Sequence, residues 1–260
     1  MQLEAFLFVN WIFWVTLTAG TILVVGVTEV LGGTTRGYRL FMAALVAVLA
    51  GILILSELSL PAGTAASGSA DLRRGLVIGL AAGCVAYLIA SIARWAPRGW
   101  LAVVTGALGL VALVVLAVAG GTRSGPLFAG QLVLAALALG SVFAAMLLGH
   151  WYLVTPKLSP TPLRRMMWLL LVVLGLQGVG FALAIVLLGA EPITGGVAWL
   201  TWLRLGVGIL LPIGVTVLAI LASRAASLQA STGLLYIGLA LIMAGSIAGA
   251  SLSYLTGVPV

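Results

Sequence analysis

The chain has 260 residues, of which 63% are hydrophobic and only 7% are charged. Soluble globular domains carry about 25% charged residues, so this chain has too few polar side chains to cover a soluble fold. The net charge of +7 would suggest nucleic acid in a soluble protein. Here the cations lie between apolar runs, where anionic lipid headgroups are the expected partner. The composition predicts an integral membrane protein with no nucleic-acid partner.

Eight apolar runs follow one another, each long enough to cross about 30 Å of hydrocarbon as a helix. The first has no basic segment before it and is too long for the apolar region of a signal peptide, so we interpret it as a span. We expect an all-α polytopic fold in a single transmembrane domain, 1–260, with halves at 1–123 and 124–260. The expected spans are roughly 5–31, 38–60, 74–93, 100–120, 127–153, 166–189, 197–222 and 232–256.

Basic residues predict the orientation, because cytoplasmic loops carry an excess of Lys and Arg. More cations follow the odd-numbered spans than the even-numbered ones, so we expect the odd-numbered loops in the cytoplasm. Both termini would then lie outside a cell (inner) membrane. The cations after odd-numbered spans are Arg36, Arg39, Arg94, Arg98, Lys157, Arg164, Arg165 and Arg224. Those after even-numbered spans are Arg73, Arg74 and Arg123.

Ionisable side chains inside spans mark candidate sites, because each charge costs about 2.5–3.5 kcal/mol on insertion. The expected orientation places Glu29 and His150 near the cytoplasmic surface, and Glu57 and Arg204 nearer the outer one. We therefore predict a buried ion pair between Glu57 and Arg204. A structural lock between helices is the simpler interpretation of this pair, and an ion or substrate site is the alternative. Weaker candidates are the uncharged polar residues Asn10, Gln131 and Gln177.

The segment LGHWYLVTPKLSPTPLRR, residues 148–165, holds the only histidine and the only lysine of the chain. Trp151 and Tyr152 are typical of the aromatic belt at a membrane surface. Imidazole both donates and accepts protons near neutral pH, which suits a quinone headgroup. We predict a quinone site of His150, Glu29, Tyr152 and Trp151, with an interfacial histidine that meets no acid as the alternative. Tyr152 points about 200° away from His150 on a regular helix, so it joins this site only if the helix unwinds.

The residue inventory excludes several kinds of chemistry. A single histidine cannot supply bis-histidine haem ligation, and a single cysteine excludes a cysteine-ligated cluster within the chain. No HExxH, GxSxG, P-loop or dinucleotide-binding motif occurs in a suitable context. We expect no haem, iron–sulfur, flavin or metal site in this chain, and no catalytic residue acting alone.

The C-terminal stretch STGLLYIGLALIMAGSIAGASLSYLTGVPV resembles the last span of the NrfD/polysulfide-reductase and DMSO-reductase membrane anchor family. The similarity covers the number of spans, the missing cofactor ligands and the ending YLTGVP. It implies two four-helix bundles that pass electrons between quinol and a partner iron–sulfur subunit. Members often carry an acid and an arginine before this ending, where the present chain has Ser246 and Ser251.

Three functions follow from these observations. The favoured one is an integral membrane subunit of a respiratory complex that anchors redox partner subunits and interacts with quinone, either menaquinone or ubiquinone, in electron transfer. The second is a small-molecule or ion transporter that uses Glu57, Arg204 and Glu29, with a broken helix near Pro212. The third is a structural, scaffolding or lipid-handling membrane protein.

Overall fold

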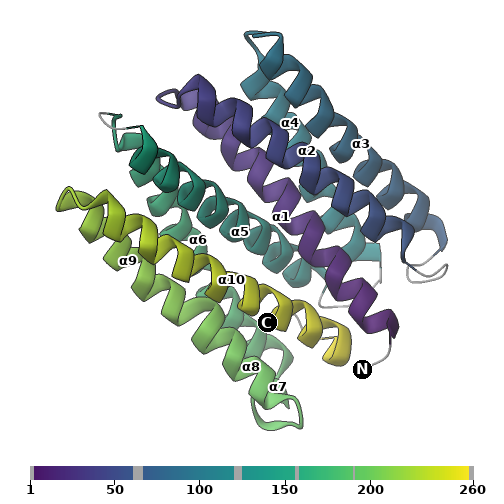
Figure 1. Ribbon diagram of the computed structural model, residues 1–260. Helices are drawn as coiled ribbons and strands as arrows, with labels where there is room; N and C mark the ends of the chain where they lie inside the picture. Colours follow the sequence, from purple (N-terminus) through teal and green to yellow (C-terminus); the bar gives the residue numbers. More distant parts are fainter. Residues whose placement is uncertain (1–2, 61–66, 120–124, 156–157, 190, 258–260) are drawn as a thin grey trace.

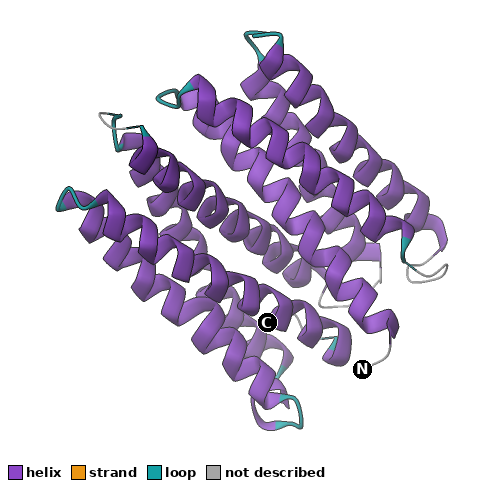
Figure 2. Ribbon diagram, in the orientation of Figure 1, coloured by secondary structure: helices purple, strands orange, loops and turns teal. Residues whose placement is uncertain are grey.

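The computed structural model describes residues 3–60, 67–119, 125–155, 158–189 and 191–257. Eight helical spans in these ranges are long and apolar enough to cross a membrane, and the same ranges contain no strand (Figure 2). The expected all-α polytopic membrane fold is confirmed. Six spans are α1 (Leu3–Leu31), α2 (Arg36–Leu58), α3 (Ser67–Ile92), α4 (Arg98–Ala119), α5 (Gly125–Val154) and α6 (Thr161–Leu188). After the short α7 (Glu191–Thr194), the seventh span comprises α8 (Ala198–Leu205), η1 (Gly206–Leu210) and α9 (Leu211–Arg224), and the eighth is α10 (Leu228–Thr256).

The spans form two groups of four helices (Figure 1). The first group contains α1 to α4, and the second contains α5, α6, the α8–η1–α9 span and α10. Helices α1 and α5 are the most buried spans, and the contact between them joins the two groups. Both chain termini lie at the same end of the helices (Figure 1), as an even number of spans requires.

Two glycines allow α1 and α5 to touch. A Cβ atom on Gly20 would overlap the backbone of Ala136, and one on Gly140 would overlap the backbone of Gly20. Lipid provides no hydrophobic force between helices, so close packing through small residues is a main source of their association. The junction between the two groups therefore depends on the missing side chains at Gly20 and Gly140.

Helix α3 begins earlier than its hydropathy predicts. The apolar run starts near residue 74, whereas the helix starts at Ser67. Its first two turns contain polar residues, which resemble a loop in the sequence. One of them, Arg73, is buried with 7% of its surface exposed, so this side chain packs inside the first helix group.

The seventh span is interrupted before Pro212. Proline has no N–H group to donate to the carbonyl four residues earlier, and the preceding turn is a π-helix in which the Leu211 N–H donates to the Gly206 carbonyl. Gly208 in this turn packs directly against Gly245 of α10, and a Cβ on either glycine would overlap the other. Such π-helical turns occur frequently at functional sites.

The glycine contact generates a stability prediction. Gly20→Ala should lower the free energy of unfolding in detergent by about 1–3 kcal/mol, because the added methyl group overpacks the α1–α5 contact. Gly51→Ala is the matched control, since Gly51 is exposed and a methyl group added there would meet no other atom within 4 Å. Denaturant titration measures both changes, and equal stabilities of the two variants would contradict the role assigned to Gly20.

The predicted orientation has a direct test by cysteine labelling, because the native Cys84 is buried. Ser159 and Gly196 are exposed in the connections after α5 and before α8, which lie at opposite ends of the spans. In intact cells, a membrane-impermeant maleimide should label Gly196→Cys and should label Ser159→Cys only after the membrane is opened. The reverse pattern would place both termini in the cytoplasm.

Candidate functional site

Glu57 is buried in the first helix group, where Arg73 neutralises it. Arg73 Nη2 lies 3.0 Å from Glu57 Oε1, and Trp11 Nε1 donates a hydrogen bond to Oε2 at 2.6 Å. The Arg73 guanidinium also lies over the Trp11 ring, 5.0 Å from its centroid, a favourable cation–π position. The predicted ion pair between Glu57 and Arg204 is therefore wrong. Arg73, which the hydropathy pattern places in a loop, takes the role expected of Arg204.

Glu29 also finds its partners within the first group. Arg98 Nε lies 2.6 Å from Glu29 Oε1, and Arg39 Nε lies 3.8 Å from the same oxygen. The Tyr87 hydroxyl donates to Oε2 at 2.9 Å. These partners come from α2, α3 and α4, so the carboxylate is neutralised at this end of the group. It does not meet His150.

His150 and Tyr152 lie on different sides of α5. His150 is exposed, and its Nδ1 lies 3.5 Å from the hydroxyl of Tyr236 on α10. Tyr152 is buried and donates a hydrogen bond to the Ser159 carbonyl at 2.8 Å. Because α5 stays helical to Val154, the two side chains keep the divergence of a regular helix. Tyr152 therefore does not join His150.

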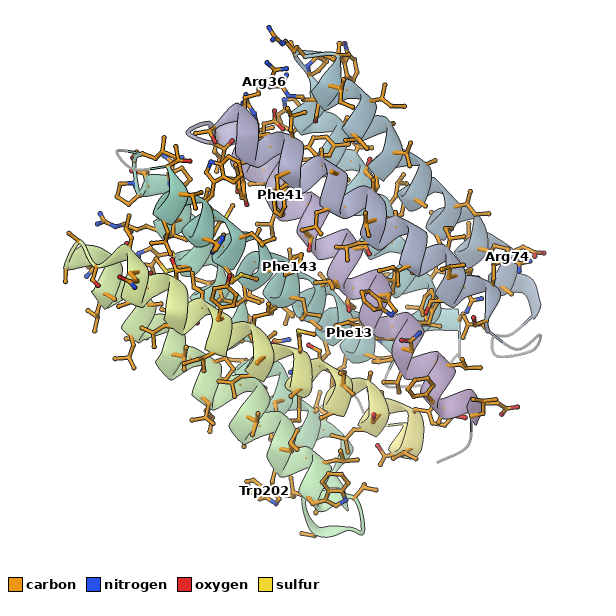
Figure 3. The ribbon with its side chains drawn as sticks, in the orientation of Figure 1. Phe13, Arg36, Phe41, Arg74, Phe143 and Trp202 are labelled. Carbon is orange, nitrogen blue, oxygen red and sulfur yellow. The ribbon has the colours of Figure 1, made fainter. Side chains whose placement is uncertain are left out.

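Trp151 packs against the start of α2. A Cβ on Gly37 would overlap the Trp151 ring. The centroids of the Tyr38 and Phe41 rings lie 6.5 Å and 6.4 Å from the centroid of the Trp151 ring (Figure 3 labels Phe41). The four side chains expected around one quinone headgroup thus have separate surroundings. The expected pocket of His150, Glu29, Tyr152 and Trp151 is not formed.

A different polar site lies within the second helix group. Arg204, at the end of α8, is only 3% exposed, about two turns into its span. Each of the other three spans in this group also supplies a polar side chain near it. These are Gln131 from α5, Gln177 from α6 and Ser246 from α10.

The hydrogen bonds at Arg204 are incomplete. In the amide orientation that satisfies both of its polar atoms, the Gln177 oxygen accepts a hydrogen bond from Arg204 Nη2 at 3.1 Å. Arg204 Nε and Nη1, both amide atoms of Gln131 and the Ser246 hydroxyl are buried and have no hydrogen-bond partner. Among the described side chains, no carboxylate forms an ion pair with Arg204. The site therefore presents a positive charge and several hydrogen-bond donors without a partner in an apolar environment.

The rest of the cavity wall is mainly apolar. Ile12 and Phe13 of α1 and Phe128 of α5 line it, so both helix groups contribute (Figure 3 labels Phe13). The space inside is about 30 Å³, enough for about two water molecules. A guanidinium and an amide with free N–H groups bind acceptor oxygens. The cavity therefore suits a ligand that combines a carbonyl or carboxylate oxygen with apolar surface.

The sequence reveals the members of this site but not their grouping. Arg204 stands out as a charge within a span, and Gln177 and Gln131 as amides in apolar runs. Their convergence depends on the rotation of three helices about their axes. Ser246 is uncharged and stands out in the sequence only through the resemblance to the anchor family, whose members often carry a charged residue there.

The two glutamines should respond oppositely to the same substitution. Gln131→Leu removes an amide that has no partner, so it should raise the free energy of unfolding by about 1 kcal/mol. Gln177→Leu leaves Arg204 Nη2 unpaired and should lower it by about 1–3 kcal/mol. Denaturant titration in detergent compares the two variants. A loss of stability in Gln131→Leu as large as that in Gln177→Leu would mean that the Gln131 amide is partnered.

The chain matches no family model and no curated protein sequence.

Proposed function

We propose that this chain is the membrane-embedded subunit of a respiratory complex, that it binds a quinone at the Arg204 cavity and that it anchors a redox partner. One observation carries the proposal: buried donors on Arg204 and Gln131 have no partner. A buried donor without a partner costs about 1–3 kcal/mol. A ligand oxygen in the cavity would recover that free energy.

A quinone matches the two properties of the cavity. Its ring carbonyls accept hydrogen bonds without bringing a charge into the membrane, and its apolar tail lets it enter from the lipid. Arg204 and Gln131 would hold a carbonyl oxygen, and Phe13 and Phe128 would contact the ring. The space of about 30 Å³ admits an oxygen but not a whole ring, so binding of the ring would require the aromatic side chains that line the cavity to move.

The protein would contribute position and polarity. A bound quinone supplies the electron and proton chemistry, while the guanidinium favours electron density on the oxygen that it contacts. With one histidine and one cysteine in the chain, the electron donor or acceptor would belong to a partner subunit. The resemblance of the last span to the anchor family supports this division of roles.

A second candidate is a transporter for a small carboxylate. The π-helical turn beside Arg204 and Pro212 supports it, because transporters bind ligands near broken helices at membrane depth. A carboxylate would neutralise Arg204. It would also need a water-filled route to the cavity, whereas a quinone enters from lipid.

Binding of a short-chain quinone to the purified protein tests the proposal. Gln131→Leu should weaken the affinity on the order of fivefold, the equivalent of one hydrogen bond of about 1 kcal/mol, without unfolding the protein. Gln229→Leu makes the same chemical change at an exposed position of α10, outside the cavity, and should leave the affinity unchanged. Equilibrium dialysis with ubiquinone-1 and with menadione measures both.

Two outcomes would contradict the quinone proposal. One is no saturable quinone binding by the wild-type protein, and the other is equal affinity in wild type and Gln131→Leu. Uptake of a small carboxylate into liposomes that is lost in Arg204→Lys, together with absent quinone binding, would favour the transporter. Lysine keeps the charge and loses the planar fork of donors.

A further inference from the structure

A second cavity lies at the predicted cytoplasmic end of the first helix group. Its volume is about 230 Å³. Figure 3 labels Arg36 at this end of the helices and Arg74 at the opposite end. Its lining residues are Arg36, Arg39, Leu40, Ser91, Arg94 and Arg98. Four arginines, two at the start of α2 and two between the end of α3 and the start of α4, therefore line one space.

The positive charge of this cavity is only partly neutralised. Glu29 pairs with Arg98 at 2.6 Å and lies 3.8 Å from Arg39. Arg36 and Arg94 form no ion pair within the described part of the chain. Four arginines against one carboxylate leave an excess of positive charge that an anion would offset.

The backbone conformation at Arg94 is unfavourable for an arginine. Arg94 has a φ of 58°, in the left-handed region that favours glycine at helix ends. The Trp95 N–H donates to the Ala90 carbonyl at 2.9 Å, which closes α3 in the way that usually accompanies a glycine. An arginine is strained at this position, yet its side chain lines the cavity.

We propose that this arginine cavity binds a phosphate ester. Guanidinium groups make paired hydrogen bonds to phosphate oxygens, and four of them around one space can contact several of these oxygens at once. Its place at the end of the spans is the depth of lipid headgroups. The phosphate would belong either to an anionic lipid headgroup or to a soluble phosphate compound.

Binding to protein purified in an uncharged detergent tests this proposal, at constant ionic strength. The probes are dihexanoyl phosphatidylglycerol, dihexanoyl phosphatidylcholine and inorganic phosphate. Phosphatidylglycerol should bind saturably and raise the melting temperature. Phosphatidylcholine should bind at least tenfold more weakly, because its choline cation offsets the phosphate charge and is repelled by the arginines. A similar effect of inorganic phosphate would identify the soluble source, and its absence would identify the lipid.

The variant Arg36→Gln/Arg94→Gly should weaken phosphatidylglycerol binding at least tenfold. Both arginines are exposed, and glycine relieves the strain at position 94, so the fold should persist. Arg165→Gln removes an exposed cation at the same end of the spans, outside the cavity, and should not change binding. Arg165→Gln removes one charge and the double variant removes two, so a loss of binding free energy in Arg165→Gln that is half of the loss in the double variant would show attraction by general charge only. That result, or no saturable binding of any probe, would overturn the proposal.

Discussion

The need to neutralise every charge within the membrane determines how these helices are arranged. In the first group the rule is obeyed: Glu57 meets Arg73 and Trp11, and Glu29 meets Arg98. Each contact joins different helices, so neutralisation also fixes their rotation. Removing one partner of such a buried pair lowers the stability of the fold, because the remaining charge stays unpaired in a medium of low dielectric constant.

Among the described residues of the second group, Arg204 departs from this rule. Arg204 has Gln177 as its polar contact and retains free donors. The π-helical turn that follows and the contact between Gly208 and Gly245 fix the backbone next to it. The two groups thus differ in charge balance. In the first group the buried acids are paired with cations, although Arg73 also keeps N–H groups without a partner. In the second group Arg204 has no carboxylate partner among the described residues. This difference is why we place the functional site in the second group.

The sequence predicts the eight spans well, because length and apolarity determine which segments cross a membrane. It fails at Ser67–Arg73, where a polar helix start has the composition of a loop. The sequence also does not predict which charged side chains form ion pairs. The depth of a residue in the membrane cannot by itself distinguish Arg73 from Arg204 as the partner of Glu57. Helix rotation and the path of the chain decide that choice. The same limit applies to His150 and Glu29, which share a predicted depth but lie against different helices.

Photoaffinity labelling tests the proposed quinone site at the Arg204 cavity directly, with the segment around His150 as the alternative location. A photoreactive azidoquinone would be bound to the purified protein, illuminated and located by peptide mass spectrometry. We predict modification of the segments that contain Phe13 and Phe128, and its loss when excess unlabelled quinone is present. Labelling confined to residues 148–155, or labelling that unlabelled quinone does not displace, would contradict a quinone site at Arg204.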